Sequence, residues 1–165
     1  MRIIFASGRD FLPDRVDGAI MSVHTLLELV QERGHPCEAI VGISVDNLRR
    51  SFIHRARRML TRRQVWGWMD RENGYPTYRA WENHVAKLLE ERIAAFQPDL
   101  VITQLERSEA MAEAAVRFGI PVILFVRDAE FAWHRGVITD NPLVLFVASS
   151  RFVSQQVTGK LGREA

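Results

Sequence analysis

Two predicted helix starts carry residue types that could bind an anion. Gly18 follows the polar segment 7–17 and opens a helical pattern. Its backbone can approach a ligand closely, and the free N–H groups of a first helical turn favour an anion such as a phosphate. Alternatively, Gly18 only permits a tight turn. Ser149, Ser150 and Arg151 open the last helical pattern with two hydroxyl groups and a cation, a second candidate anion pocket. The sequence contains no GxGxxG segment and no P-loop, so it predicts neither a dinucleotide site nor a Walker-type site.

Charged and amide side chains also follow two short apolar segments, 100–102 and 122–126. Both segments are almost continuously apolar, as expected of parallel strands covered on both faces. The helix-length segment between them has Ser108 as its expected N-cap and Gly119 as its end. Such crossovers are nearly always right-handed, so the loops after both strands lie on one edge of the sheet, where α/β proteins bind ligands. The polar residues expected at that edge are Gln104, Glu106, Arg107, Arg127, Asp128 and Glu130.

These loops require a sheet that positions them, and the apolar patterns predict one. Strands are expected at 2–6, 37–43, 100–102, 122–126 and 143–147, with a hairpin at 65–81 around an Asn73-Gly74 turn. Helices are expected at 18–33, 46–63, 81–96 and 108–119, and from 149 onward. Five or six strands alternating with helices indicate one α/β domain over residues 1–165. We predict a Rossmann-like, doubly wound, mainly parallel sheet in a three-layer α/β/α arrangement.

Two of the predicted helices have clear ends and inward faces. The first has Asp17 as its N-cap and Gly34 after its last turn, with Ile20, Val23, Leu27 and Val30 at three-to-four spacing. The helix at 81–96 places Val85, Leu89 and Ile93 at four-residue intervals, and Pro98 closes it. Both patterns predict helices that pack on the sheet.

The positive charge of the chain is concentrated in one segment. Of the 22 lysines and arginines, seven lie between Arg49 and Arg63, where no acidic residue occurs, so the other 15 face 20 acidic residues. Segment 46–63 reads as a basic amphipathic helix that could lie on an anionic membrane or pack its apolar stripe on the sheet. Nucleic acid is a weaker alternative, because no aromatic residues alternate with the arginines. The candidate membrane contacts are Arg50, Arg57 and Arg58.

Composition indicates an ordinary globular domain, 47% hydrophobic and 25% charged. The single cysteine, Cys37, lies in an apolar segment, so no disulfide framework is expected and a reducing compartment is favoured. No metal-ligand spacing occurs, no apolar segment approaches the length of a membrane span, and a strand starting at Arg2 leaves no room for a signal peptide. The aromatic residues of the hairpin could stack a sugar or a base, or simply cover an edge strand. His134, in the irregular segment after Asp128, is the histidine best placed for chemistry or an ordinary loop histidine.

Six segments occur in a recognisable order and spacing. They are RIIFAS at 2–7, DGAIMSVHTLLELVQERGHPCEAIVG at 17–42, NGYPTYRAW at 73–81, FQPDLVIT at 96–103, FGIPVILFVRDAEF at 118–131 and VASSRFVSQQV at 147–157. Together they resemble the N-terminal domain of family-4-type glycosyltransferases, which have the GT-B fold. RGH and GIPV occur in many Rossmann-like proteins, so the order of all six segments carries the resemblance.

The resemblance implies that the chain is the acceptor-side half of a two-domain enzyme whose C-terminal, donor-binding domain is absent from this sequence. Such enzymes transfer a sugar, commonly a hexose, from a nucleotide-sugar to an acceptor in a cleft between two domains, without a metal or other cofactor. The leaving diphosphate needs cations and helix-end N–H groups from both sides of the cleft, so we expect this half to be inactive alone. The implied partners are the nucleotide-sugar donor, a sugar or lipid-linked acceptor and, through 46–63, the inner face of a membrane. A cytoplasmic, peripheral location is expected, and no nucleic-acid partner.

Several positions match the family pattern for substrate binding. Gly18 and Ala19 match its Gly-Gly loop with the second glycine replaced, and the extra methyl group narrows the approach of a donor phosphate. Glu106 lies where relatives carry an acid, and Ser150 matches the serine of the closing motif, which could be only a helix cap. Acceptor specificity is expected in the loops 9–17 and 129–141. The basic candidates for substrate binding are Arg9 and Arg151.

The largest departure from the family pattern is at Arg127 and Asp128, where many relatives have a histidine followed by a small or acidic residue. An arginine cannot act as a neutral acceptor or give up its proton. Arg127 could instead bind an anionic group of donor or acceptor, which leaves Asp128 or Glu130 as the candidate catalytic carboxylate. Alternatively, Arg127 only forms an ion pair with Asp128 or Glu106 that braces the edge of the sheet.

Two other classes of function fit the sequence. The chain could be a non-catalytic Rossmann-like module that binds a nucleotide or a phosphorylated ligand, or an assembly subunit whose sheet edge is filled by a partner. An enzyme, a binding module and a structural subunit therefore all remain open.

Overall fold

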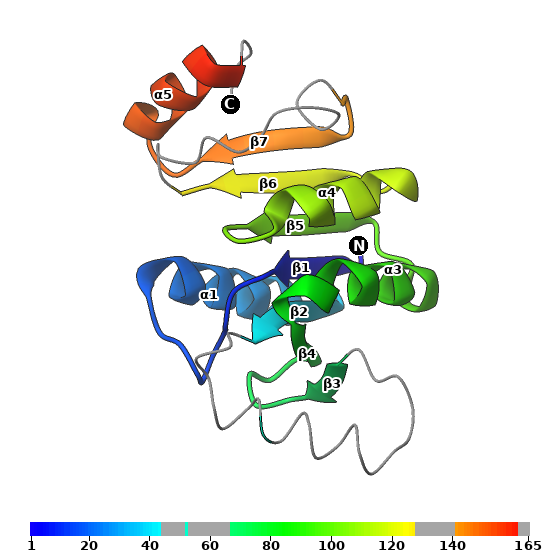
Figure 1. Cartoon of the computed structure of the whole chain (residues 1–165). Coiled ribbons are helices and arrows are strands. Elements are labelled where there is room, and N and C mark those ends of the chain that lie inside the picture. The colour runs from blue at the N-terminus through cyan, green and yellow to red at the C-terminus, as the bar shows by residue number, and fades with distance from the viewer. Residues whose placement is uncertain (44–51, 53–66, 128–140, 162–165) are drawn as a thin grey trace.

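The computed structural model describes residues 1–43, 52, 67–127 and 141–161. Within these ranges, seven strands form one sheet in the order β3-β4-β2-β1-β5-β6-β7 (Figure 1). The strands are β1 (Ile3–Ser7), β2 (Cys37–Ile43), β3 (Gly67–Asp70), β4 (Thr77–Trp81), β5 (Leu100–Gln104), β6 (Val122–Val126) and β7 (Val144–Ala148). Every pairing is parallel except that of β3 with β4. The predicted Rossmann-like fold is confirmed, and the described strands exceed the expected five or six because both arms of the hairpin join the sheet.

Helices cover both faces of the sheet, as predicted. Figure 1 shows α1 (Gly18–Glu32) behind the sheet, with α3 (Val85–Phe96) and α4 (Ser108–Arg117) in front of it. The alternation of β1 decides which side chains meet which layer, since Ile3 and Phe5 pack with α1 whereas Ile4 and Ala6 face the other layer. Buried apolar surface of this kind is the main stabilising term of the fold.

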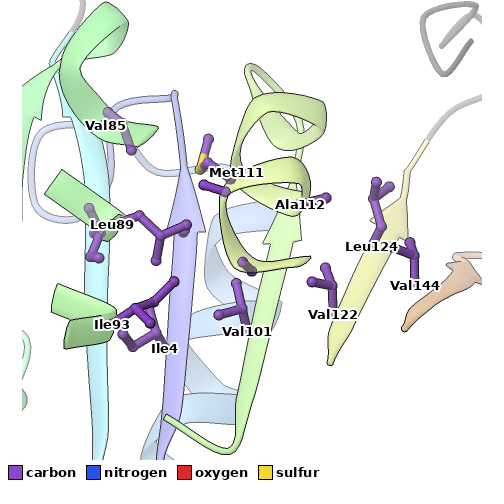
Figure 2. Packing of buried hydrophobic residues seen from close by; sticks show 14 of the residues in the cluster. Ile4, Val85, Leu89, Ile93, Val101, Met111, Ala112, Val122, Leu124 and Val144 are labelled. Carbon is purple, nitrogen blue, oxygen red and sulfur yellow. The ribbon is translucent and has the colours of Figure 1, made fainter. Parts of the chain in front are cut away.

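Figure 2 shows the core beneath α3 and α4. Side chains from the two helices interdigitate with those of the central strands, and the cluster continues to the far edge through Val144. Leu89 and Ile93 of α3 lie near Ile4, and Ala112 of α4 lies above β5 and β6. Val85, Leu89 and Ile93 are all buried, which confirms the predicted inward face of this helix.

The ends of α1 follow the sequence closely. The carboxylate of Asp17 accepts a hydrogen bond from the N–H of Ile20 at 2.9 Å, so it caps the helix as predicted. After the last turn Gly34 has a φ of +80°, which a glycine adopts without strain. Ile20, Val23 and Leu27 are buried, and Val30 packs against the same cluster from a partly exposed position.

The start of α4 differs from the prediction. Ser108 is the first residue of the helix, and Arg107 occupies the N-cap with a left-handed φ of +63° and no side-chain hydrogen bond to the helix. The hydroxyl of Ser108 is buried and has no hydrogen-bond partner among the described residues. A serine preceding an apolar pattern was a reasonable N-cap candidate, but the turn after β5 shifts the helix start by one residue. Gly119 ends the helix with a φ of +71°, as expected.

The predicted hairpin and the helix after it are both present in modified form. β3 and β4 pair antiparallel from Asp70 opposite Thr77, and the N–H of Gly74 donates to the carbonyl of Arg71 at 3.1 Å. Trp68 on the edge strand β3 is buried, and so is Tyr75, which packs in the core cluster beneath α1, so neither side chain belongs to an open stacking ribbon. The expected helix at 81–96 consists of a short 3-10 turn, η1 (Glu82–His84), followed by α3.

The last helix, α5 (Arg151–Leu161), follows β7 directly. Of the predicted basic helix at 46–63, only Phe52 is described, as a helical residue that is 74% exposed. The candidate membrane contacts Arg50, Arg57 and Arg58 lie outside the described residues, and so does His134. None of the described helices is long and apolar enough to cross a bilayer.

Candidate functional site

The loops that follow β1 and β5 are joined to each other and to the end of β2 by backbone hydrogen bonds at the carboxyl edge of the sheet. The N–H of Gly8 donates to the carbonyl of Glu106 at 2.7 Å, and the N–H of Gly42 donates to the carbonyl of Arg9 at 3.1 Å. A Cβ atom on Gly42 would stand 1.7 Å from the carbonyl oxygen of Gly8. The close approach therefore depends on glycine, and it brings Arg9 beside Glu106.

Arg127 connects the end of β6 to β5 and α1. Its Nε donates to Oε1 of Gln104 at 2.8 Å, and its Nη2 donates to Oγ of Ser22 at 2.9 Å and to the carbonyl of Ala19 at 3.4 Å. The guanidinium also lies over the ring of Phe125, 4.3 Å from its centroid. Gln104 itself donates to the carbonyl of Ala19 at 3.3 Å. The positive charge of Arg127 is therefore held beside the first turn of α1.

The environment of Arg127 lowers the pKa of its guanidinium but leaves the group charged. Burial lowers the pKa of the guanidinium below its ordinary value, and the nearby carboxylate of Asp17 acts in the opposite direction. A guanidinium stays protonated at neutral pH even after such a shift. Arg127 therefore acts as a fixed, partly desolvated cation.

Arg9 lies on the other side of the α1 start, between two carboxylates. Its Nε is 3.0 Å from Oε1 of Glu106 and its Nη1 is 3.6 Å from Oδ2 of Asp17. The Arg9 Nε is not oriented for a hydrogen bond, so the contact with Glu106 is an ion pair only. Arg15 also contacts Asp17, at 3.0 Å. Around the start of α1, the described arginines Arg9, Arg15 and Arg127 outnumber the two carboxylates, Asp17 and Glu106. This group of five residues therefore carries one excess positive charge.

Asp17 keeps its negative charge at this position. Burial raises the pKa of its carboxyl group, but the hydrogen bond from Ile20 and the charges of Arg15 and Arg9 together lower it below its ordinary 3.8. The carboxylate thus serves both the helix cap and the arginine pairs. It also competes with any anion for the start of α1.

Gly18 is open on the side where a side chain would stand. Apart from its chain neighbours and the backbone of its own helix, no atom of the described residues lies within 4 Å of a Cβ built here, and its φ is not in the left-handed range. Neither space within the protein nor backbone conformation requires a glycine here, so the tight-turn interpretation receives no support. The open space at Gly18 could admit a ligand atom, which is the alternative that the sequence raised.

Glu106 is presented by an unusual turn. The residues on either side of it, Leu105 and Arg107, have left-handed φ values of +60° and +63°. Left-handed conformations are costly for residues with long side chains and concentrate at functional sites. Leu105 is buried, whereas Arg107 is exposed and pairs with Glu82 at 3.0 Å. No sequence signal marks this turn, because neither residue is a glycine or an asparagine.

The remaining predicted site residues have mixed outcomes. Oγ of Ser150 accepts from the N–H of Val153 at 3.2 Å, so Ser150 caps α5 in the ordinary way. Oγ of Ser149 donates to the carbonyl of Arg127 at 3.0 Å, which ties the start of α5 to this edge. Arg151 is exposed in the first turn of α5. Their roles in binding stay predictions.

Two further expectations concern the partners of Arg127. The alternative of an ion pair between Arg127 and Glu106 is wrong, because Glu106 pairs with Arg9 and Arg127 bonds to Gln104, Ser22 and Ala19. The other form of that alternative, an ion pair with Asp128, is not tested. The candidate carboxylates Asp128 and Glu130, and the loop 129–141 up to residue 140, lie outside the described residues.

Three residues of this site were missed by the sequence analysis. Ser22 and Gly8 were not singled out, and no signal in one sequence distinguishes them. Gly42 could have been found, because a glycine inside a buried strand often marks a close approach of another backbone. Among the described residues, no group of three or more His, Cys, Asp or Glu side chains is placed to hold a metal ion.

The fold and the edge together define a Rossmann-like α/β domain with a cationic cluster at the carboxyl ends of its strands. No protein-family model and no curated protein matches the sequence. Among solved structures, the chain is similar to the crystal structure of Acinetobacter baumannii MurG, with a TM-score of 0.44 and 13% identity over 76% of this chain. The match covers 34% of the MurG chain, so this chain spans about a third of that protein's length. This level of similarity does not assign the chain to a family.

Proposed function

We propose that this chain is the acceptor-side N-terminal domain of a glycosyltransferase that moves a sugar from a nucleotide-sugar to an acceptor. The observation that carries the proposal is the arrangement at the start of α1, where Arg9 contacts Asp17 and Arg127 contacts Ala19, the residues immediately before and after the exposed Gly18. The order of the six sequence segments supports the same assignment. Ligands of open α/β sheets bind at this edge.

The chemistry of sugar transfer explains why such an edge would be used. When the glycosidic bond of a nucleotide-sugar breaks, negative charge develops on the leaving diphosphate. Fixed cations and helix-start N–H groups stabilise that charge without reorganising during the reaction. Arg127 suits this role because its contacts with Gln104 and Ser22 hold it in place. The catalytic carboxylate is proposed among Asp128 and Glu130.

We expect the 165-residue chain to bind but not to transfer. One wall of a cleft can contact a diphosphate, yet it cannot exclude water or align donor and acceptor. Nothing in the proposal requires a metal or another cofactor. The acceptor is proposed to be a sugar or a lipid-linked sugar, reached by peripheral contact of Arg50, Arg57 and Arg58 with an anionic, cytoplasmic membrane face.

The test combines binding with turnover. The chain is titrated with inorganic diphosphate and with a panel of nucleotide-sugars, and the complete natural gene product is assayed with the same donors and soluble or lipid-linked acceptors. The proposal expects weak diphosphate binding by the chain and sugar transfer by the complete product only. Transfer by the chain alone would overturn the half-site interpretation, and no transfer by the complete product with any donor would overturn the glycosyltransferase assignment.

A non-catalytic nucleotide- or phosphate-binding module is the second candidate. It is favoured by the fact that both arginines and the open helix start belong to this one chain. Tight binding of a free nucleotide, with no transfer by the complete product, would select this candidate. Membrane contact is tested separately by sedimentation with vesicles that contain or lack an acidic lipid, where salt-sensitive binding is expected.

A further inference from the structure

Arg79 of β4 is a buried cation that joins two separate segments. Only 1% of its surface is exposed, although arginine has one of the largest side chains. Its Nε donates to Oδ2 of Asp70 in the neighbouring strand at 2.7 Å, and its Nη1 lies 3.4 Å from Oδ2 of Asp14 in the loop after β1. Its Nη2 also donates to the carbonyl of Leu12. One guanidinium therefore holds the hairpin on one side and the β1–α1 loop on the other.

The same loop carries Arg9 and ends at the cap of α1. Leu12 is bonded to the hairpin a second time, because its carbonyl also accepts from Nδ2 of Asn73 at 3.2 Å. Phe11 is 1% exposed and its ring centroid lies 5.6 Å from that of Phe5. Between Arg9 and Asp17 the loop is thus held at its centre by apolar packing and by Arg79. Its two ends, Arg9 and Asp17, contact each other at 3.6 Å directly before Gly18.

We propose that Arg79 is a positioning residue that sets the placement of Arg9 and Asp17 for a diphosphate-bearing ligand at the start of α1. The inference rests on the proposed function. Arg79 does not itself reach the ligand site; it acts through the loop backbone. Its planar fork donates in several directions at once, whereas a lysine offers a single charged point. Removing it would leave the carboxylates of Asp14 and Asp70 without their shared cation.

The chain contains a matched control for this role. Arg92 of α3 makes a two-point contact with Glu38 of β2, at 2.9 and 2.8 Å, and Glu38 is 5% exposed. The guanidinium also lies 4.5 Å from the ring centroid of Tyr78. Glu38 belongs to the amino-terminal half of β2, the opposite end from Gly42. Arg92→Met therefore disrupts a comparable ion pair without touching the β1–α1 loop.

The experiment compares Asp14→Asn, Arg79→Lys and Arg92→Met with the wild-type chain. Two quantities are measured on each folded variant: hydrogen exchange of the backbone amides in residues 8–17, and affinity for inorganic diphosphate. Asp14→Asn is included because it removes only the charge of Asp14 and leaves Arg79 paired with Asp70 and bonded to the Leu12 carbonyl, so the variant should fold.

For Asp14→Asn and Arg79→Lys we expect faster exchange in residues 8–17 and about a tenfold loss of diphosphate affinity, the effect of losing one charge-assisted hydrogen bond to the ligand. Arg92→Met should change neither quantity. Unchanged exchange in both loop variants would overturn the proposal, and so would faster exchange without a loss of affinity. A wild-type chain that binds no diphosphate contradicts the proposed function instead, and exchange alone then decides whether Arg79 fixes the loop.

Discussion

Gly8 and Gly42 are in backbone contact at the carboxyl edge of the sheet, closer than any residue with a Cβ could allow at Gly42. A Cβ atom at that position would lie 1.7 Å from the Gly8 carbonyl oxygen and 2.3 Å from its carbon. Gly42→Ala must therefore push the β1 loop away from β2. We expect a loss of about 3 kcal/mol in the free energy of unfolding, measured by urea denaturation, at the upper end of the usual cost of overpacking.

Gly18→Ala is the matched control for Gly42→Ala. The position is open and has no left-handed φ, so alanine should leave the stability within about 0.5 kcal/mol of wild type or raise it slightly. Diphosphate affinity should nevertheless fall, because the new methyl group occupies the space proposed for the ligand. A Gly18→Ala variant with full affinity would show that the ligand does not use this space.

Arg127 should contribute to ligand affinity more than to stability. Arg127→Met keeps much of the side-chain volume over Phe125 but removes the charge and the bonds to Gln104 and Ser22. A lost charge-assisted hydrogen bond to a diphosphate corresponds to about tenfold in affinity or more. Calorimetric titration with diphosphate measures this difference directly.

Arg117→Met provides the comparison for Arg127→Met. Arg117 pairs with Glu90 between α4 and α3, with both side chains exposed, and it lies in the last turn of α4, away from the start of α1. This exposed pair should contribute between about 0 and 1 kcal/mol to stability and nothing to binding. Equal losses of affinity in the two variants would indicate a general charge effect and contradict a specific role for Arg127.

Much of the fold followed from local patterns in the sequence. Short, continuous apolar segments such as 122–126 favour strands of a covered parallel sheet, and the glycines after two helices mark their ends. The helix start at Ser108 was the exception. Serine is often found at N-caps, but this preference did not decide the helix start here. The preceding turn adopts a left-handed conformation that places Arg107 at the cap.

The site was only partly predictable, for a physical reason. Topology alone places the ends of parallel strands on one edge, so the proximity of Gly18, Glu106 and Arg127 could be foreseen. The partners of each side chain depend on distances of a few ångströms set by packing. For Arg127 the sequence left open either an anionic ligand or an ion pair with Asp128 or Glu106, whereas its described hydrogen-bond partners across β5 and α1 are an amide, a hydroxyl and a carbonyl.

Asp17 should make stability depend on pH in the acidic range. Its pKa is lower in the folded chain than the ordinary 3.8, so its contribution is fully present above that value and is lost as the pH falls through the folded pKa. Asp17→Asn keeps a capping oxygen without the charge. The variant should lose less stability than wild type on acidification below about pH 4, the range set by the carboxyl pKa. Thermal unfolding between about pH 2 and 6 measures this difference, and parallel curves for the two proteins would contradict it.

Arg107 tests whether the turn beside Glu106 stores backbone strain. Its left-handed φ of +63° costs a residue with a side chain about 1 kcal/mol or more relative to glycine, whereas its exposed pair with Glu82 contributes little. Arg107→Gly and Arg107→Ala both remove the pair, but only glycine removes the strain. Arg107→Gly should therefore be more stable than Arg107→Ala by about 1 kcal/mol in urea denaturation, despite the greater flexibility of glycine in the unfolded chain. If alanine proves equal or better, the turn is not strained, and the position of Glu106 must come from its backbone bond to Gly8 and its ion pair with Arg9.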